Sequence, residues 1–428
     1  MKKIYLLFFL LPSWGVCQVP QFDASALFLL HDSDTQPHTF SSGVIQKEAA
    51  QRDLFSIVTL PLGQALKQEI RSIPVPNSAI RVGKSMAIHT DLRLGYILEH
   101  RGSIPKNITQ VSVSPTMEDL EKGEFMTIVD FTDLEIPKAL FKMPIAVNPT
   151  SISISPDYQH IAISSTTEER EIEVLELDES GKPIRIISKP VNLPSGRIVD
   201  VQWHPSGDFL TFINETTRTV GILRAVKDGP TKRLVRLEFV DQTIALGKKP
   251  TVGRFTPDGN YFLVLDPKKS KADFRTREIG EMYVVKLASE PGAAHYLLSR
   301  TEVGENPQDF SIASDGKKVA VCNAENSFFE VQPTEVSKSS LSLLSLNPQG
   351  LVKKVKDFPT DGLLPMAIVF DKEGKNLAVS VHEVGAYGVK VGSVEFWKYQ
   401  EMAGKPTLSK QAVQLFTPRG LHSIHVFN

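Results

Sequence analysis

Short apolar runs separated by polar turns recur along most of the chain. Each copy contains an apolar strand, a turn with Asp and usually Gly, and a second apolar strand. Asp or Ser bonds its own backbone in such turns, and Gly adopts the positive φ that they need, so each copy predicts a β-hairpin. The clearest copies are SISISPDYQHIAIS from Ser151, VDVQWHPSGDFLTFI from Val199, VGRFTPDGNYFLVL from Val252, DFSIASDGKKVAVCN from Asp309 and AIVFDKEGKNLAVSV from Ala367, with a looser copy from Ser85.

The spacing of these hairpins predicts the architecture. They begin near residues 85, 151, 199, 252, 309 and 367, at intervals of 48 to 66 residues. Third strands are predicted in EFMTIVDF from Glu124, GEMYVVKL from Gly280 and GSVEFWKY from Gly392. No amphipathic helix longer than about two turns competes with this interpretation. An interval of about 50 residues is typical of one four-stranded blade of a β-propeller, so the fold class is all-β.

The two ends of the chain contain complementary parts of one further unit. The C-terminal GLHSIHVFN is a first strand without a hairpin partner, whereas ASALFLLHDSD and DLFSIVTLP near the N-terminus are a second and a third strand. Pairing of Leu421–Phe427 with the strand around Ala26–Leu30 would close a ring and remove its exposed sheet edges. Six internal units and one shared unit predict a single domain over residues 18–428, a seven-bladed β-propeller.

Residues 1–17 do not fit the repeat. Lys2 and Lys3 precede an apolar run, which smaller residues follow around Gly15 and Cys17. This is the order of a secretory signal peptide, and the run is too short to span a bilayer. We therefore expect export to the periplasm or the extracellular space, with cleavage after Cys17. Lipid attachment at Cys17 is the less favoured alternative.

Composition excludes several classes of partner. Charged residues make up 23% of the chain and the net charge is −1, so no general attraction to nucleic acid or anionic lipid is expected. P-loops, dinucleotide fingerprints and well-spaced metal motifs are absent, so neither a cofactor nor a metal is predicted. The nearest metal-like cluster, HDSDTQPH from His31, is interpreted as a solvated loop. Cys322 is expected to be a small buried hydrophobic residue, and the protein is expected to be a monomer.

The segment NPQDFSIASDGKKVAVCN at 306–323 and its weaker copies resemble the YVTN-type repeats of β-propellers, including lactonase-like, 6-phosphogluconolactonase-type proteins. The resemblance covers essentially the whole chain after residue 17, although the Tyr-Val-Thr-Asn core is nowhere intact. It implies the propeller fold but says little about chemistry, because such repeats occur in binding, structural and enzymatic propellers. Lactonase-like and cyclase propellers of this kind use a His, an Arg and a carboxylate around the channel.

Candidate site residues follow from the geometry of a propeller, in which the loops that enter the first strands converge on one end of the channel. Four of these entering residues are cations and none is an acid, which predicts a funnel for a small organic anion. The entering residues are Lys84, Asn148, Arg197, Lys249, Asn306, and Arg419 with His422. The resemblance makes His422, Arg197 and Arg419 candidate catalytic residues, which leaves Lys84, Asn148, Lys249 and Asn306 as candidate ligand-binding residues.

Two functional hypotheses remain open. The first is a non-catalytic exported propeller that binds a protein, a glycan or a small organic anion at the mouth of its channel. The second is a lactonase-like hydrolase that acts on a sugar or organic-acid lactone. A catalytic carboxylate is not placed, because Asp200 and Asp309 each lie one step inside a strand and nothing selects between them. This favours the binding protein. His89, His204 and His425 are expected to be structural.

Overall fold

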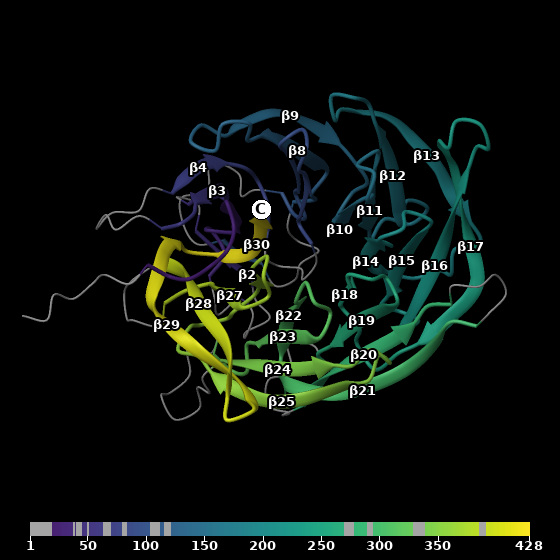
Figure 1. The fold of residues 1–428 in the computed structure, drawn as a ribbon. Coiled ribbons are helices and arrows are strands. Elements are labelled where there is room, and N and C mark those ends of the chain that lie inside the picture. Colours follow the sequence, from purple (N-terminus) through teal and green to yellow (C-terminus); the bar gives the residue numbers. More distant parts are fainter. Residues whose placement is uncertain are drawn as a thin grey trace, which may run out of the picture.

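Seven four-stranded antiparallel blades surround a central channel in the computed structural model of the protein (Figure 1). The predicted seven-bladed propeller is therefore confirmed. The structure describes residues 19–36, 39, 45–48, 51–62, 70–78, 84–102, 112–114, 121–268, 278–288, 294–327, 339–384 and 391–428. The predicted signal peptide and His38 lie outside these residues. Among the described residues, no helix is long and apolar enough to cross a membrane.

Each blade runs from an inner strand beside the channel to an outer strand at the rim. The first blade contains β5 (Met86–His89), β6 (Leu94–Leu98), β8 (Phe125–Asp130) and β9 (Lys138–Pro144). The second contains β10 (Pro149–Ile154), β11 (His160–Ser165), β12 (Ile172–Leu177) and β13 (Pro183–Val191). The third contains β14 (Ile198–Trp203), β15 (Phe209–Asn214), β16 (Thr219–Lys227) and β17 (Leu234–Ala245). A short parallel pairing of β13 with β17 links the second and third of these blades at the rim.

The next three blades repeat the same order. The fourth blade contains β18 (Val252–Phe255), β19 (Tyr261–Asp266), β20 (Ile279–Lys286) and β21 (Tyr296–Glu305). The fifth contains β22 (Pro307–Ile312), β23 (Lys318–Asn323), β24 (Ser340–Leu346) and β25 (Val352–Pro359). The sixth contains β26 (Ile368–Phe370), β27 (Asn376–Val381), β28 (Val391–Met402) and β29 (Lys405–Pro418). Every hairpin and third strand that the sequence predicts lies on one of these strands. A separate pair joins β2 (Ile45–Lys47) to β7 (Ser112–Ser114).

The seventh blade joins the two ends of the chain. It contains, from the channel outward, β30 (Leu421–Phe427), β1 (Ala26–His31), β3 (Leu54–Thr59) and β4 (Arg71–Pro74). β30 pairs with β1 in an antiparallel register in which Ala26 lies opposite Phe427 and Leu30 opposite Ser423. The predicted closure of the ring by the C-terminal strand is confirmed.

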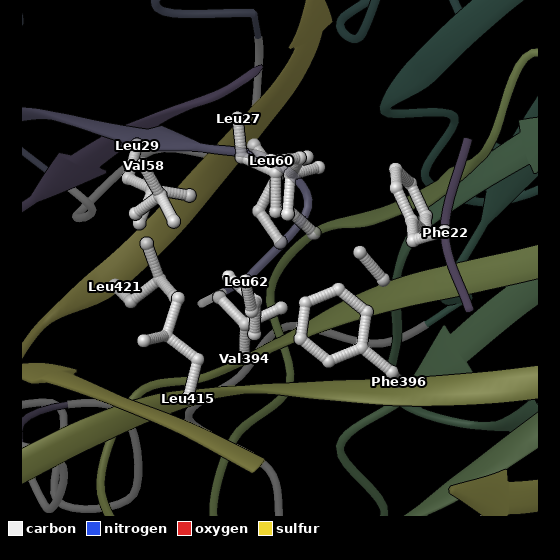
Figure 2. Close-up of a cluster of buried hydrophobic side chains, with 13 residues drawn as sticks. Phe22, Leu27, Leu29, Val58, Leu60, Leu62, Val394, Phe396, Leu415 and Leu421 are labelled. Carbon is white, nitrogen blue, oxygen red and sulfur yellow. The ribbon is translucent and has the colours of Figure 1, made fainter. Parts of the chain in front are cut away.

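A buried apolar cluster holds the closing blade against the sixth blade. Figure 2 shows Leu27 and Leu29 of β1 together with Val394 and Phe396 of β28. Leu421, on β30, is fully buried in the same cluster. Each such aliphatic side chain contributes roughly 1.5–3 kcal/mol when it is removed from water, so the closure is stabilised by packing as well as by strand pairing.

The hairpin turns have the chemistry that the sequence predicts. In the Pro-Asp-Gly turn, Gly259 has φ of 73° and its N–H donates to the carbonyl of Thr256 at 2.9 Å. Asp258 accepts hydrogen bonds from the Thr256 hydroxyl and from the Asn260 N–H. A tight turn of this kind needs a positive φ, which glycine adopts without strain.

Candidate functional site

Polar side chains on the inner strands connect neighbouring blades around the channel. Asp200 on β14 is buried and accepts hydrogen bonds from the Ser151 hydroxyl of β10 at 2.5 Å and from the Gly253 N–H of β18 at 2.7 Å. Burial raises the pKa of Asp200, while these hydrogen bonds oppose the shift. Asp200 therefore fastens three consecutive blades together, which is a structural role for one of the two carboxylates that the sequence left open.

The channel contains a narrow cavity of about 70 Å³. Charged and titratable side chains from β18, β22, β30 and the segment before β5 line it, beside apolar groups of the inner strands. The lining residues are Lys84, Met86, Val252, Arg254, Asp309, Met366, Ala367, His422, Ser423, Ile424 and His425. Of the residues proposed from the sequence for catalysis or binding, Lys84 and His422 line this cavity.

Lys84 precedes β5 and extends its amine into the channel. Its Nζ donates to Oε1 of Gln202 at 2.6 Å, and Nε2 of Gln202 donates to Asp200 at 2.9 Å. Burial and then the neighbouring Arg254 guanidinium lower the pKa of Lys84 to about 8, although Asp200 and Asp309 act in the opposite direction. A substantial fraction of this amine is therefore neutral near physiological pH.

Arg254 on β18 is the second cation of the channel. Its Nη2 donates to Oδ1 of Asp309 at 2.5 Å, and its Nε donates to the Phe310 carbonyl at 2.6 Å. The guanidinium carbon also lies 5.5 Å from the centre of the Phe310 ring. These contacts hold the planar guanidinium in one orientation but use two of its five N–H groups, so donors remain for a ligand.

His425 on β30 lies close enough to both cations to respond to their charge. Burial, followed by Lys84 and Arg254, lowers the pKa of His425 to about 4, so the ring is neutral at pH 7. Its ring stacks on Phe28 at a centroid distance of 6.4 Å. The histidine that the sequence assigned to a structural role therefore also lines the cavity beside Lys84 and Arg254.

His422 enters the cavity from the start of β30 and is held by Asn77. Nε2 of His422 lies 2.6 Å from Oδ1 of Asn77, and the Asn77 N–H donates to Asp53 at 3.1 Å. Burial is the largest influence that lowers the pKa of His422 to about 3; His100 and His382 act in the same direction and Asp32 opposes them. His422 is therefore a neutral imidazole with one ring nitrogen in a hydrogen bond.

Arg197 and Lys249 share one acidic partner outside the channel cavity. Nε of Arg197 lies 3.2 Å from Glu215, and Nζ of Lys249 lies 3.7 Å from the other oxygen of the same carboxylate. The Arg197 side chain is 40% exposed. The structure thus brings these two cations together, and Glu215 offsets part of their charge.

Arg419 belongs to a different group of charges. Its guanidinium lies 3.3 Å from Glu48 and 3.8 Å from Glu383, and its Nη2 donates to the Ser33 carbonyl at 2.9 Å. The side chain is only 5% exposed. Within the described residues, no contact joins Arg419 to Arg197.

The two predicted asparagines serve the loops that carry them. Oδ1 of Asn148 accepts a hydrogen bond from Arg101 at 3.0 Å, and Nδ2 of Asn306 donates to the Glu325 carbonyl at 2.5 Å. Both residues have positive φ, 52° and 48° respectively. Asparagine tolerates this region better than most residues, so a backbone requirement accounts for its presence at both loops.

The loop after β1 differs from the solvated loop that the sequence suggested. Asp32 and Asp34 are buried, and carboxylate oxygens of Asp32, Asp34 and Asp53 lie within 4.8 Å of one another. Oδ2 of Asp32 accepts a hydrogen bond from the Ser78 hydroxyl at 3.1 Å. The interpretation of this loop as solvated is wrong, because packing of the loop in the closing blade places the carboxylates inside the molecule.

Sequence reasoning did not select Arg254, because it considered the loops that enter the inner strands and not the strands themselves. A signal was available in VGRFTPDG: an arginine inside an inner strand must extend either into the channel or between blades. The sequence offered Asp309 as a possible catalytic carboxylate, but it did not predict the hydrogen bond from Arg254 that holds this side chain.

Comparisons with known proteins give the fold a context. No family model and no curated protein sequence matches this chain. Its structure is similar to a candidate 6-phosphogluconolactonase from Bacteroides uniformis, with 12% identity, a TM-score of 0.59, and coverage of 95% of this chain and 99% of the other. A second candidate 6-phosphogluconolactonase, from Bacteroides fragilis, has 12% identity, a TM-score of 0.59, and coverage of 94% and 98%.

A protein of unknown function from Desulfotomaculum acetoxidans is also similar, with 16% identity, a TM-score of 0.56, and coverage of 90% of this chain and 98% of the other. The chain shares the fold of lactonase-like propellers. The resemblance that the repeats predicted is confirmed at this level, since identities this low carry information on architecture and not on chemistry.

Proposed function

We propose that the protein is an exported β-propeller that binds a small organic anion in its central channel. The observation that carries the proposal is the pair of cations, Lys84 and Arg254, that face one buried cavity. Arg254 offers a planar donor group for a carboxylate, and Lys84 offers a point charge beside it. The charges of both groups lower the pKa of His425, which lines the same cavity, so all three side chains face one small space.

The size of the cavity favours a small ligand over a protein or a glycan. One water needs about 10–15 Å³ of such space, so a cavity of about 70 Å³ corresponds to roughly five waters. An anion of the size of acetate or lactate fits this space, whereas a sugar acid requires the channel to widen. Asp309 also lines the cavity and limits the net positive charge, which favours a monoanion.

Isothermal titration of the full chain with anions of graded size tests this proposal. We expect binding of acetate and lactate, weaker binding of gluconate, and none of the neutral analogue acetamide. Equal binding of acetate and acetamide, or no binding of any of these monoanions, would contradict the proposal.

The alternative is a lactonase-like hydrolase with His422, Arg197 and Arg419 as its catalytic residues. The likeness to candidate 6-phosphogluconolactonases favours it. The hydrogen bond from His422 to Asn77 and the low pKa of the ring oppose a role as general base, because an effective base has a pKa near the working pH. A hydrolysis assay with δ-gluconolactone and γ-butyrolactone decides: turnover that His422→Gln abolishes would establish the lactonase.

Export is part of the proposal and rests on the sequence of residues 1–17, with Lys2 and Lys3 before an apolar run. N-terminal sequencing of protein from the exported fraction should show a chain that starts at or near Gln18. An intact Met1 in cytoplasmic protein would contradict export, and a lipid on Cys17 would indicate an anchored form.

A further inference from the structure

The amine of Lys84 lies in an environment that differs from that of a surface lysine. It lines the channel cavity together with Arg254, it is oriented by Oε1 of Gln202, and the Arg254 guanidinium is close enough to lower its pKa. Lys248, in contrast, extends from the surface and forms an ion pair with Glu278 at 2.7 Å, which raises its pKa. Lysines become nucleophiles when they are desolvated or placed next to another cation, and both conditions apply to Lys84.

We propose that Lys84 reacts as a nucleophile with the carbonyl carbon of a small oxo acid whose carboxylate is bound by Arg254. This inference rests on the proposed binding of a small anion and names the class of ligand. Glyoxylate and pyruvate have the size that the cavity admits, and each has a carbonyl carbon directly bonded to its carboxylate. Binding of the carboxylate by Arg254 therefore brings an electrophilic carbon next to the neighbouring amine.

The reaction is a condensation that needs neither an oxidant nor a reductant. The lone pair of the neutral Lys84 amine forms a bond to the carbonyl carbon, and the π electrons of the C=O bond move to its oxygen. That oxygen takes up a proton while the nitrogen loses one, which gives a carbinolamine. Loss of the oxygen as water and of a second proton from nitrogen then gives an imine.

Asp309 and Gln202 are positioned to assist these steps. Asp309 lines the cavity, and its carboxylate is close enough to influence Lys84, so it can accept and return the protons that leave nitrogen. Gln202 accepts one N–H of the amine and so directs the nitrogen. In this scheme Gln202 positions the amine, Asp309 transfers protons, and Lys84 forms the covalent bond.

Reductive trapping tests the inference directly. The full chain is incubated with glyoxylate or pyruvate and sodium cyanoborohydride, and the modified lysine is located by peptide mass spectrometry. The lower pKa increases the neutral fraction of Lys84 by roughly 100-fold over a surface lysine. A less basic amine is also a weaker nucleophile, and this reduces the gain in rate to roughly tenfold. We expect Lys84 to be modified on the order of tenfold faster than Lys248.

Matched variants identify the origin of the labelling. Lys84→Arg keeps the charge and should abolish the channel adduct, whereas Lys248→Arg should leave it unchanged. Loss of the guanidinium in Arg254→Gln should raise the pKa of Lys84 and slow its labelling by any carbonyl compound. Labelling by an oxo acid should fall further than labelling by acetaldehyde, which has no carboxylate for Arg254 to bind. The thermal transition of each variant shows whether it is folded.

The outcomes separate this inference from the proposed function. Lactate has no carbonyl group, so binding of lactate without trapping of pyruvate at Lys84 would overturn the inference and leave the proposed function standing. Failure of both lactate binding and trapping would overturn both. Modification spread over surface lysines with Lys84 unmodified, or Lys84 labelling that does not depend on Arg254, would also overturn the inference.

Discussion

The cations outside the channel cavity and those that line it have different partners. Arg197 and Lys249 share Glu215 in a setting that is partly open to solvent. Lys84 and Arg254 lie in the cavity, where burial has already shifted the pKa of Lys84. Exposed ion pairs are screened by water and salt, while buried charges interact strongly with whatever enters. Whether a charged side chain is buried or exposed therefore says more about a binding site than the sign of its charge does.

The largest expected effect concerns the strand that creates the channel. Deletion of residues 421–428 removes β30, which pairs with β1 along its length and carries His422 and His425. Loss of the strand exposes the edge of β1 and the apolar cluster around Leu27 and Leu29. We expect the truncated chain to lose most of its cooperative thermal transition in calorimetry, because domains are stable by only about 5–15 kcal/mol. A truncated chain that melts at the wild-type temperature would show that closure contributes nothing.

Acidification should have the next largest effect. Burial lowers the pKa of His31 and His422 to about 3 and that of His425 to about 4, whereas in the unfolded chain each titrates near 6.5. Between these values the unfolded chain binds more protons, so stability is complete above about pH 6.5 and falls as the pH decreases below it. Each histidine contributes a loss of up to roughly 1.4 kcal/mol per pH unit.

Urea denaturation at pH 7.5, 6.5 and 5.5 measures this dependence. We expect a small loss of stability between the first two values and a loss about three times as large between the second and the third, because the unfolded histidines are half protonated at pH 6.5. His422→Gln removes one titrating group and should make the pH dependence shallower. Equal stability at pH 7.5 and 5.5 would contradict the burial of neutral histidines in the closing blade.

A pair of arginine substitutions tests the contrast between the cations outside the cavity and those that line it. Arg254→Ala should weaken the binding of a small carboxylate by roughly 10- to 100-fold, which corresponds to the 1.5–3 kcal/mol of a charged hydrogen bond. Arg197→Ala should change the affinity less than about twofold, because Glu215 already occupies its guanidinium. Titration calorimetry compares the two. The reverse order would place the anion beside Arg197 and support the candidate residues chosen from the sequence.

This contrast also shows why the fold could be predicted more completely than the site. Repeated turns such as Pro-Asp-Gly before Asn260 are local signals, and each predicts a hairpin without knowledge of the rest of the fold. The strands near the two ends of the chain complete one further unit, so the number of blades followed from the number of repeats. The charge environment of Lys84 depends on Arg254 and Asp309, which lie on the inner strands three and four repeats further along the chain. Such a neighbourhood arises only when the ring brings distant first strands together. The same reasoning missed Asp53, which comes directly before β3 and lies near Asp32, the residue that follows β1.

The smallest expected effects separate Arg197 and Arg419 by their burial. Arg197 is 40% exposed with one acidic partner, so Arg197→Gln should change the free energy of unfolding by less than about 1 kcal/mol. Arg419 is 5% exposed, donates to the Ser33 carbonyl, and lies near two carboxylates, so Arg419→Gln should cost roughly 1–3 kcal/mol. Urea denaturation of the two variants in low and high salt compares them: only the small Arg197 effect should disappear in high salt, because its ion pair is open to solvent. Equal costs for both substitutions would show that depth does not distinguish these arginines.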